Sequence, residues 1–397
     1  MRHPGLEAGH ALRIASALAE RLDRDGWHGA DPYDGLASPF ARWIPQARPR
    51  LHQAFLQCVR RSPINLRPIL RVDHRRMAAA TGLASTASAR LASDPHWRAR
   101  RDRLARMTIE SQMRDGRYRG LWGYEFDVQT RWGSYGAADP NIVATSFAAH
   151  GCLDARALDE DRTTWLARGL LRNLWRNAYF AYSPGSAVLI HNANLLGAAL
   201  AARLAASPAL DRGLGDDLRG AVDAAVATAL RWQREDGSWP YGEGRALGWV
   251  DGYHTAYILL SLDAVCSLGV VDDSARRALD RGARFYFERM FDGSRPRHYA
   301  GRRVVPSDCN NVATGLRAAV WGAGKGYVPP TFPAQVFTFL IARFWDRRQY
   351  FRASGSRLRP AARLNYPRWA AAPALDALTA LAAHEQNPGG ARAAVVR

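Results

Sequence analysis

Apolar residues recur every three or four positions along most of the chain, the spacing that gives a helix one buried face. Loops rich in Gly, Pro and aromatic residues separate these segments. The two-residue alternation typical of strands is rare and short. We therefore expect an all-α protein of paired antiparallel helices rather than a doubly wound sheet. The pattern predicts helices over 8–24, 46–60, 70–82, 96–113, 141–157, 160–180, 187–206, 213–234, 252–269, 272–291, 309–320, 332–346 and 369–384.

A weak internal repeat sharpens this prediction. Asp-Gly follows a predicted helix end in Gln112–Gly116 and in Gln233–Trp239, and Phe291–Ser294 echoes it. Glycine just past a helix end can take the left-handed conformation that caps the helix. Aromatic residues come next in each copy, namely Trp122 and Tyr124, Trp239 and Tyr241, and Tyr299. The succession of helix, Asp-Gly, aromatic loop and helix is typical of an α/α toroid, a six-hairpin-like barrel around a central cavity. A thin helical solenoid is the alternative.

Composition and charge indicate which classes of binding partner fit this chain. The chain has 397 residues, of which 23% are charged, and a net charge of +19. Lys325 is the only lysine, and the excess of arginine is spread out along the chain, with about +9 in residues 1–110 and about +10 in the rest. This distribution makes nucleic-acid binding unlikely and favours contact with an anionic polymer or with membrane headgroups. The four cysteines are scattered and no metal, P-loop or Rossmann motif occurs, so we expect no metal and no cofactor.

The chain shows no boundary in composition within its helical part. We expect one toroid domain over 95–385, an N-terminal helical arm over 1–94 packed on it, and a frayed tail over 386–397. The arm should wrap the outer helices and shape one side of the cavity mouth, with Asp34 and Arg67 held by hydrogen bonds. The alternative is a separate arm that docks on a membrane or a partner. The sequence shows no run of 18 apolar residues and no secretory signal. These observations predict a cytoplasmic protein, either free or bound peripherally to the inner membrane face.

The densest group of candidate site residues lies in the stretch from Leu121 to Gly133, which alternates with period two. Side chains two apart on an extended segment share a face and lie about 6.5–7 Å apart. Carboxylates at that spacing, beside an amide and a guanidinium, suit acid/base work on a sugar. An edge strand whose charges pair with each other is the alternative. One face carries Trp122, Tyr124, Phe126, Val128 and Trp132, and the other carries Glu125, Asp127, Gln129 and Arg131.

Polar residues at two predicted helix starts are weaker candidates. Asn141 opens one helix after Asp139-Pro140, where capping alone also explains the residues. His191, Asn192 and Asn194 lie in an otherwise apolar helix. They either face the cavity or serve as satisfied core residues.

The stretch from Trp239 to Tyr257 is the strongest candidate. Asp251 and His254 lie three apart at a helix start, on one face. A carboxylate beside an imidazole raises its basicity and fixes its tautomer, as a general base needs. The alternative makes Asp251 an N-cap and His254 a buried hydrogen-bond partner. Several aromatic residues could stack on sugar rings, namely Trp239, Tyr241, Trp249, Tyr253 and Tyr257.

Two further helix starts complete the set. Asp308 precedes Asn311 and is either a cap or a cavity acid. Arg368 and Trp369 place a cation and a stacking ring together, with Tyr299 as another aromatic candidate in the preceding loops.

Several of these stretches together resemble the VpsJ-like polysaccharide biosynthesis proteins of bacterial exopolysaccharide and O-antigen clusters. The resemblance covers most of the chain and implies an α/α toroid with a role in making surface glycans. One departure is that Asp308-Cys309-Asn310-Asn311 stands where the family has an Asp-x-His-Ser-type stretch. We therefore place Asp251 and His254 ahead of Asp308. The shared motifs are Asp31–Ser38, Arg61–Pro68, Leu121–Gly133, Pro140–Phe147, Asn192–Gly197, Trp249–Tyr257 and Tyr366–Trp369.

Three functions remain open at this point. The first is a carbohydrate-active enzyme on an acidic glycan or glycosyl lipid, of the uronate C5-epimerase, lyase or hydrolase type, with Arg131 and Arg368 as carboxylate clamps. The second is a non-catalytic glycan-binding or assembly factor of a polysaccharide synthesis complex. The third is a terpene cyclase or prenyltransferase, whose toroid carries similar turns, although the Asp-x-Asp-Asp motif of the cyclases is absent.

Overall fold

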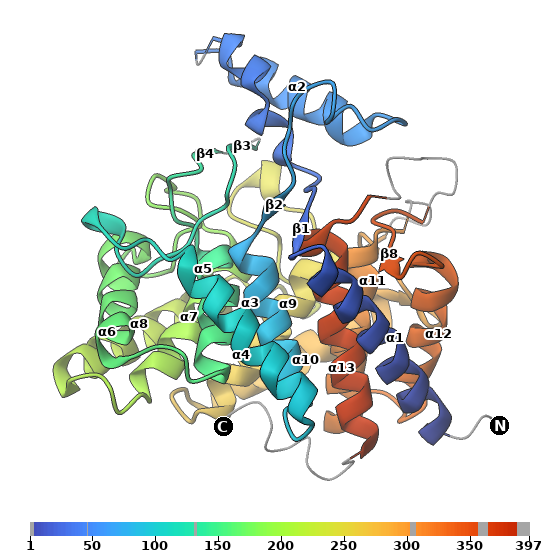
Figure 1. Cartoon of the computed structure of the whole chain (residues 1–397). Coiled ribbons are helices and arrows are strands. Elements are labelled where there is room, and N and C mark those ends of the chain that lie inside the picture. The colour runs from blue at the N-terminus through green and yellow to red at the C-terminus, as the bar shows by residue number, and fades with distance from the viewer. Residues whose placement is uncertain (1–3, 46, 131–132, 302–306, 356–363, 387–397) are drawn as a thin grey trace.

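The computed structural model describes residues 4–45, 47–130, 133–301, 307–355 and 364–386. Within these ranges the protein is a barrel of two concentric rings of helices (Figure 1). Each inner helix contacts the next, and α13 contacts α3 to close the ring. The inner helices are α3 (Ala78–Ala89), α5 (Ile142–Asp154), α7 (His191–Ala205), α9 (Gly252–Ser267), α11 (Cys309–Lys325) and α13 (Ala372–Gln386). The outer helices are α1 (Pro4–Arg24), α4 (Pro95–Glu110), α6 (Glu160–Gly169), α8 (Arg212–Arg231), α10 (Asp273–Arg289) and α12 (Phe332–Phe344). The predicted α/α toroid is confirmed.

The two rings differ in sequence because they differ in surroundings. Inner helices are rich in Ala, Gly and Leu, and 14 of the 15 residues of α7 are buried. Small residues let these helices approach closely. A Cβ on Gly82 of α3 would lie 2.4 Å from the carbonyl oxygen of Phe147 on α5. The outer helix α8 instead buries one stripe, with Leu218, Val222 and Ala225 among its members, and leaves its charged face in solvent.

Backbone hydrogen bonds join most of the loops at one end of the barrel. The starts of α5, α7, α9 and α11 each bond to the loop that precedes the next inner helix. Tyr241 O accepts from His191 N of α7, His298 O accepts from Gly252 N of α9, and Ala353 O accepts from Cys309 N of α11. This end, called the mouth below, therefore has a fixed backbone frame.

Short strands occur at this end in the described residues. Each pairs antiparallel with one partner over two residues. The pairs are β1 (His28–Gly29) with β2 (Arg75–Arg76), β3 (Val128–Gln129) with β4 (Ser134–Tyr135), β5 (Phe291–Asp292) with β6 (Arg295–Pro296), and β7 (Trp345–Asp346) with β8 (Tyr350–Phe351). Short helical turns fill other loops, namely η1 (Asp34–Ala37), η2 (Pro39–Trp43), η3 (Gly116–Tyr118), η4 (Leu170–Leu174), η5 (Arg245–Leu247) and η7 (Pro367–Ala371).

The expected boundary at residue 94 needs correction. Helix α1 packs on α13, and α3 is a member of the inner ring, so both belong to the barrel. The part that leaves the barrel is residues 30–74, called the cap segment below, which carries α2 (Pro49–Arg61). Figure 1 shows α2 above the mouth, near β3 and β4, and not along the outer helices. The expected bond between Arg67 and Asp34 is confirmed, because the Arg67 guanidinium lies 2.8 Å from Asp34 Oδ1 with both side chains buried.

The glutamines of the two Gln-x-x-Asp-Gly stretches make similar hydrogen bonds. Gln112 Nε2 donates to Gly120 O in its own loop, and Gln233 Nε2 donates to Gly237 O. The Oε1 of Gln112 accepts from Arg162 of α6, and the Oε1 of Gln233 accepts from an arginine of α10. Each glutamine thus ties its turn to the next outer helix, which is the structural basis of the repeat.

Candidate functional site

The mouth gathers polar side chains because each inner helix begins there. The first turn of a helix has backbone N–H groups without internal partners, and side-chain oxygens satisfy them. Asn141 caps α5, Asp251 caps α9 and Asp308 caps α11. The predicted cap for α5 was Asp139, which instead accepts a hydrogen bond from Gly136 N. Two of these caps, Asp251 and Asp308, lead to the candidate chemistry.

Asp251 and His254 form a fixed dyad. Asp251 Oδ1 accepts from His254 N at 3.0 Å, and Oδ2 lies 2.6 Å from His254 Nδ1. The indole Nε1 of Trp249 donates to the same Oδ2 at 3.1 Å. Burial acts to raise the pKa of Asp251, but the imidazole and its hydrogen bonds outweigh it and hold the pKa below the ordinary value. Asp251 is therefore a carboxylate that accepts a hydrogen bond from Nδ1–H of His254.

The other nitrogen of His254 is the available one. Its side chain remains 18% exposed. Within the described ranges, Nε2 of His254 has no hydrogen-bond partner. An imidazole that donates from Nδ1 to a carboxylate presents a lone pair on Nε2, which is the arrangement of a general base.

Aromatic rings enclose the dyad. Tyr241 stacks on Trp249 with ring centroids 4.7 Å apart and planes 10° apart, and it lies 4.6 Å from the His254 ring. Tyr253 lies 3.9 Å from His254 and 6.0 Å from Trp369. These rings form an aromatic wall around the dyad, in which Tyr241 is buried and Trp249 and Tyr253 are partly exposed.

Asp308 is the second acid at the mouth. The Trp369 indole donates to both of its carboxylate oxygens, at 3.1 and 3.0 Å. Burial raises the pKa of Asp308 above its ordinary value, although Trp369 and the nearby His298 act in the opposite direction. The charges of both Asp251 and Asp308 act to raise the pKa of Tyr253, so both acids lie near this residue. Their pKa values are displaced in opposite directions, as in acid/base pairs of enzymes.

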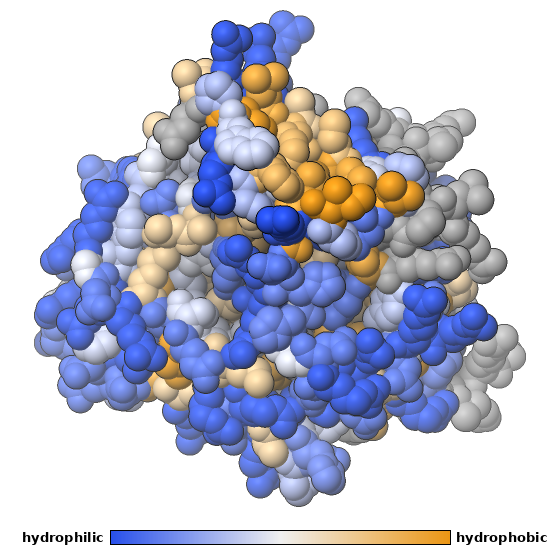
Figure 2. All heavy atoms as spheres, turned by 45° about the horizontal axis from the view of Figure 1, so that its top comes forward, coloured by the Kyte–Doolittle hydropathy of each residue, from blue (hydrophilic) through white to orange (hydrophobic). Residues whose placement is uncertain are grey.

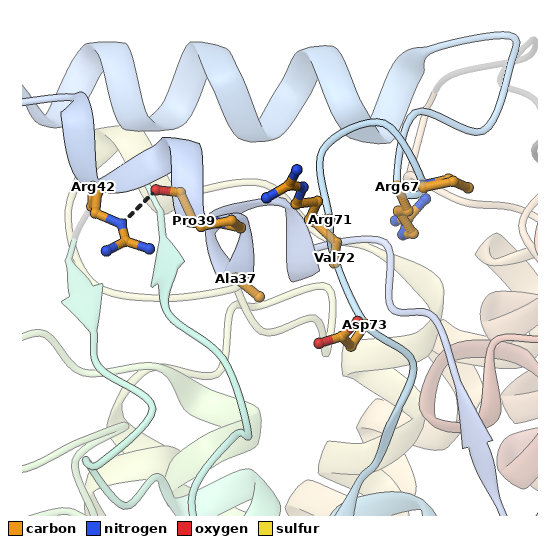
Figure 3. Close-up of a pocket in the computed structure, with 8 residues that line it drawn as sticks. Ala37, Pro39, Arg42, Arg67, Arg71, Val72 and Asp73 are labelled. Carbon is orange, nitrogen blue, oxygen red and sulfur yellow. Dashed lines mark hydrogen bonds between the residues drawn. The ribbon is translucent and has the colours of Figure 1, made fainter.

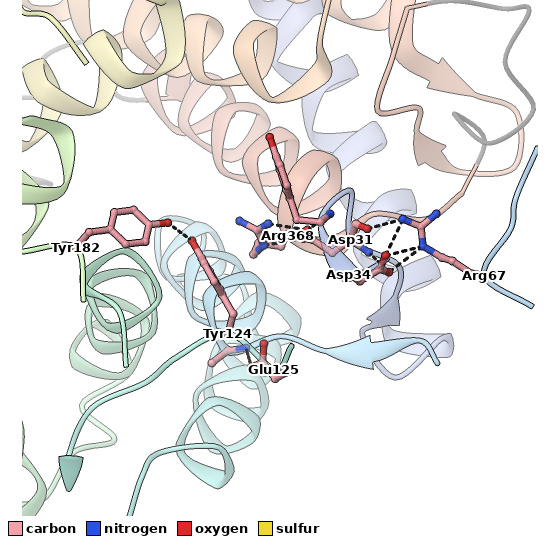
Figure 4. A network of polar contacts seen from close by, with 9 residues as sticks. Asp31, Asp34, Arg67, Tyr124, Glu125, Tyr182 and Arg368 are labelled. Atoms are coloured by element: carbon pink, nitrogen blue, oxygen red, sulfur yellow. Dashed lines mark hydrogen bonds and ion pairs between the residues drawn. The ribbon is translucent and has the colours of Figure 1, made fainter. Parts of the chain in front are cut away.

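Arg368 is not available as a carboxylate clamp. Its Nε and NH2 groups donate to Asp31 of the cap segment at 2.7 and 2.8 Å, a bidentate pair (Figure 4). The guanidinium also lies 4.7 Å from the centre of the Tyr124 ring, and the Tyr124 hydroxyl bonds to Tyr182 at 3.0 Å. Arg368 therefore joins the cap segment to the barrel, and the predicted role in substrate binding is replaced by this structural one.

The two carboxylates of the alternating stretch separate. The alternation itself holds, since Tyr124 and Phe126 are buried and Asp127 is exposed. Glu125 Oε1 accepts from Ala78 N at the start of α3, at 2.8 Å, and Asp127 Oδ1 accepts from Ala137 N. Burial raises the pKa of Glu125 to about 7. Each carboxylate accepts a hydrogen bond from a different backbone N–H group, so the two carboxylates do not form the expected pair.

Two predicted sugar-binding tryptophans belong to the core. Trp122 and Trp239 are almost fully buried. Their indole N–H groups donate to Thr108 O at the end of α4 and to Ala229 O at the end of α8, both at 2.9 Å. These are equivalent positions in the repeat. We therefore assign both rings to the seam between loop and outer helix, not to the mouth.

The polar residues of α7 also face the outer layer. Asn194 accepts from Phe180 N and donates to Ala225 O of α8. The His191 ring lies 5.5 Å from Trp232, is fully buried, and has its pKa lowered by burial to about 4. These contacts correct the expectation that His191 and Asn194 line the cavity.

The remaining predicted residues are placed as follows. Gln129 bonds to the carbonyls of its own turn. Asn192 and Asn311 are buried, and Asn311 donates to Arg297 O. Tyr257 lies deeper in the barrel, 5.4 Å from Phe147 of α5. Tyr299 lies beside His298 at 4.6 Å. Arg131 and Trp132 lie outside the described residues.

Residues of the cap segment and one loop histidine lie near the candidate site but were not among the site residues predicted from the sequence. Tyr33 packs on Trp369 at 5.4 Å, and the Arg60 guanidinium lies 4.6 Å above the Tyr33 ring. His298 lies in the loop before α11, 6.2 Å from Tyr253. Asp31 and Tyr33 belong to the Asp-Pro-Tyr-Asp motif that carried part of the family resemblance, so the signal for them was present. His298 has no such signal.

The cap segment covers the mouth and has a groove of its own. The groove has a volume of about 680 Å³ and lies beneath α2 (Figure 3). A second hollow, of about 350 Å³, is lined by Arg117, Arg172 and Arg176 among others. Neither contains the Asp251 dyad or Asp308. Tyr33 packs on Trp369, whose indole bonds to Asp308. The groove is lined by Ala37, Pro39, Arg42, Arg67, Pro68, Arg71, Val72 and Asp73.

The described ranges hold neither a candidate metal site nor a membrane-spanning helix. No cluster of three His, Cys, Asp or Glu side chains there could hold a metal ion. No helix in the same ranges is long and apolar enough to cross a membrane.

Comparison with solved structures identifies the class of fold. The unsaturated glucuronyl hydrolase of Bacillus sp. GL1 is 14% identical with a TM-score of 0.58, over 94% of this chain and 96% of that one. The cellobiose 2-epimerase of Bacillus thermoamylovorans is 11% identical with a TM-score of 0.60, over 78% and 88%. A polysaccharide lyase is 11% identical with a TM-score of 0.55, over 78% and 90%. This chain therefore has the α/α-toroid fold of these carbohydrate-active enzymes. Neither a protein-family model nor a curated protein matches the sequence.

Proposed function

We propose that this protein is a carbohydrate-active enzyme that moves protons on an acidic glycan at the mouth of the toroid. The observation that carries the proposal is the dyad of Asp251 and His254, with its 2.6 Å contact and an Nε2 that has no hydrogen-bond partner among the described residues. Epimerases and lyases of uronates abstract the proton next to the carboxylate, and hydrolases protonate the glycosidic oxygen. All three reactions need a placed base or acid of this kind.

In this proposal His254 is the base and Asp308 is the acid. Asp251 orients the imidazole and stabilises the imidazolium that forms when Nε2 takes a proton. The raised pKa of Asp308 retains the proton that a general acid must deliver. Tyr241, Trp249 and Tyr253 hold the sugar ring between the two groups.

An acidic substrate fits the charge at the mouth. The inner helices begin there, and the N-terminus of a helix attracts anions. Arg60 is exposed above Tyr33, and its charge acts on Asp308. Because Arg368 is paired with Asp31, Arg60 is the cation that we assign to the substrate carboxylate.

The biological setting follows from the family resemblance of the sequence. We place the reaction in bacterial surface polysaccharide synthesis or modification, with a glycan or a glycosyl lipid as substrate. A cytoplasmic location, at or near the inner membrane face, is part of this proposal. The fold similarity to degradative and epimerising enzymes supports the carbohydrate chemistry but not this setting.

A second candidate function is glycan binding without catalysis in a synthesis complex. The covered mouth favours it, because Tyr33 lies on Trp369 and closes the approach to Asp308. The aromatic rings would then act as a binding platform.

The experiment is incubation with uronate-containing oligosaccharides in D2O, followed by NMR. An epimerase incorporates deuterium at C5, a lyase forms an unsaturated uronate, and a hydrolase creates a new reducing end. We expect one of these signals from the wild-type protein and its loss in His254→Ala. Binding of the same oligosaccharides with none of the three signals would replace the enzyme proposal with the second candidate.

A further inference from the structure

The cap segment exposes large apolar side chains that no part of the described structure covers. Trp43 is 76% exposed, Ile69 is 71%, Ile64 is 56% and Leu51 is 50%. Among the described residues, one other large apolar side chain is exposed, that of Trp232, and its exposure is lower, at 37%. Exposed apolar residues that gather in one short region mark an interaction surface rather than chance exposure. We call these four residues the apolar cap surface.

The same region is strongly basic. Residues 35–72 contain seven arginines and neither Asp nor Glu. Arg67 is buried against Asp34, and the other six arginines are exposed. The whole chain carries 36 acidic residues, so a stretch of 38 positions without one is a local feature. The six exposed arginines are Arg42, Arg48, Arg50, Arg60, Arg61 and Arg71.

The apolar and basic residues share one part of the molecule. Figure 2 shows apolar side chains gathered near the end of the barrel where Figure 1 places α2, with hydrophilic residues around them. The turn at 66–71 and η2 are tied together, because Ser38 Oγ donates to Leu70 O at 2.7 Å. Arg42 and Arg71 accordingly line one groove (Figure 3). Trp43 belongs to η2, and Ile69 belongs to the turn at 66–71.

We propose that the apolar cap surface docks on the surface of an anionic lipid bilayer. A tryptophan and branched aliphatic side chains enter the boundary between headgroups and acyl chains, and the arginines pair with lipid phosphates. The charge argues against a second copy of this chain as the occupant, since two such faces would repel each other. The exposed apolar side chains argue against a bare anionic polysaccharide, because such a polymer offers no apolar phase for Ile64 and Ile69. Docking does not depend on the proposed catalysis.

The test is sedimentation of the full chain with vesicles of phosphatidylcholine alone or mixed with phosphatidylglycerol. We expect binding to the mixed vesicles that weakens as salt is added, and much weaker binding to phosphatidylcholine. Trp43→Ser with Ile69→Ser should lower the partition coefficient about tenfold or more. Arg48→Gln should lower it about fivefold. Arg212→Gln, at a position 97% exposed on α8, is the matched control and should leave it unchanged.

The outcomes separate the possible occupants. Equal binding of the wild type and the Trp43→Ser, Ile69→Ser variant to mixed vesicles would overturn the proposal. A wild-type protein that binds neither kind of vesicle would also overturn the proposal. A dimer in sedimentation velocity that dissociates in that variant, without vesicle binding, would assign the surface to a second copy instead. Melting temperatures equal to that of the wild type would show that the variants are folded, as expected for side chains so exposed.

Discussion

Nδ1 of His254 lies 2.6 Å from Oδ2 of Asp251, where Asp251 is the N-cap of α9 and His254 lies in its first turn. One carboxylate thus does two tasks, because it caps the helix through Oδ1 and orients the imidazole through Oδ2. The capping task explains why the dyad is rigid. The orienting task is the one that matters for the proposed catalysis. A substitution at Asp251 can separate the capping task from the orienting task.

Asp251→Asn should abolish turnover while leaving the helix intact. The amide oxygen of Asn still caps α9, and Asn is as good a cap as Asp. The amide nitrogen, however, faces His254 Nδ1 and favours the wrong tautomer. We expect kcat to fall by about 10³ to 10⁴ with the melting temperature changed by only a few degrees. Kinetics and thermal unfolding of the same preparation check this, and wild-type kcat in the variant would contradict the orienting role.

Asp308→Asn should change the pH profile. The protonated form of Asp308 is the active one in our account, so kcat/KM of the wild type falls as pH rises through its raised pKa. The variant cannot titrate there, so its lower activity should lack this fall. Asn retains the bond from Asn310 N that caps α11. A basic limb that persists unchanged in Asp308→Asn would assign the titration to another group.

Glu125 should make the protein less stable as pH rises. Its pKa is about 7 in the folded state against an ordinary value of 4.5, so the unfolded chain loses its proton first. The free energy of unfolding therefore falls between about pH 4.5 and pH 7, by at most about 3 kcal/mol. Glu125→Gln keeps the acceptor for Ala78 N and should remove this part of the dependence. Urea unfolding at pH 5 and pH 8 measures it, with exposed Glu235→Gln as the control that should behave as the wild type does.

Asp34→Asn should loosen the cap segment. The substitution leaves the Arg67 guanidinium buried without its carboxylate, which costs about 3–5 kcal/mol when a buried pair is broken. The exposed pair of Asp273 and Arg276 provides the control, and Asp273→Asn should change stability little. Denaturant unfolding and limited proteolysis within residues 30–74 check the prediction. Equal stability of the two variants would mean that the pair does not hold the cap.

The helices could be predicted from sequence because their periodicity is local. Most expected ranges overlap the observed helices closely, but 70–82 does not. There Arg71 adopts a left-handed conformation with φ of 53°, residues 75–76 form β2, and α3 begins at Ala78. An inner helix such as α3 is buried on nearly every side, so its Ala-rich sequence carries no amphipathic signal to fix its start.

The site was predictable where chemistry and helix starts coincide, as at Asp251, His254 and Asp308. It was not predictable where partners are distant in sequence. Arg368 pairs with Asp31, 337 positions away, which no local pattern can indicate. Trp122 and Trp239 have the composition of sugar platforms, and only their burial shows that they are core residues. His298 is a single residue in an aperiodic loop.

The central claim, that His254 is the base of a glycan-active enzyme, is tested most directly by measuring turnover and oligosaccharide affinity of His254→Ala together. Our account predicts that kcat falls by about 10² to 10⁴ while the Kd for the acidic oligosaccharide changes by no more than a few fold. Such a split requires a group that acts in the reaction and not in binding. Turnover equal to that of the wild type in His254→Ala would contradict the account.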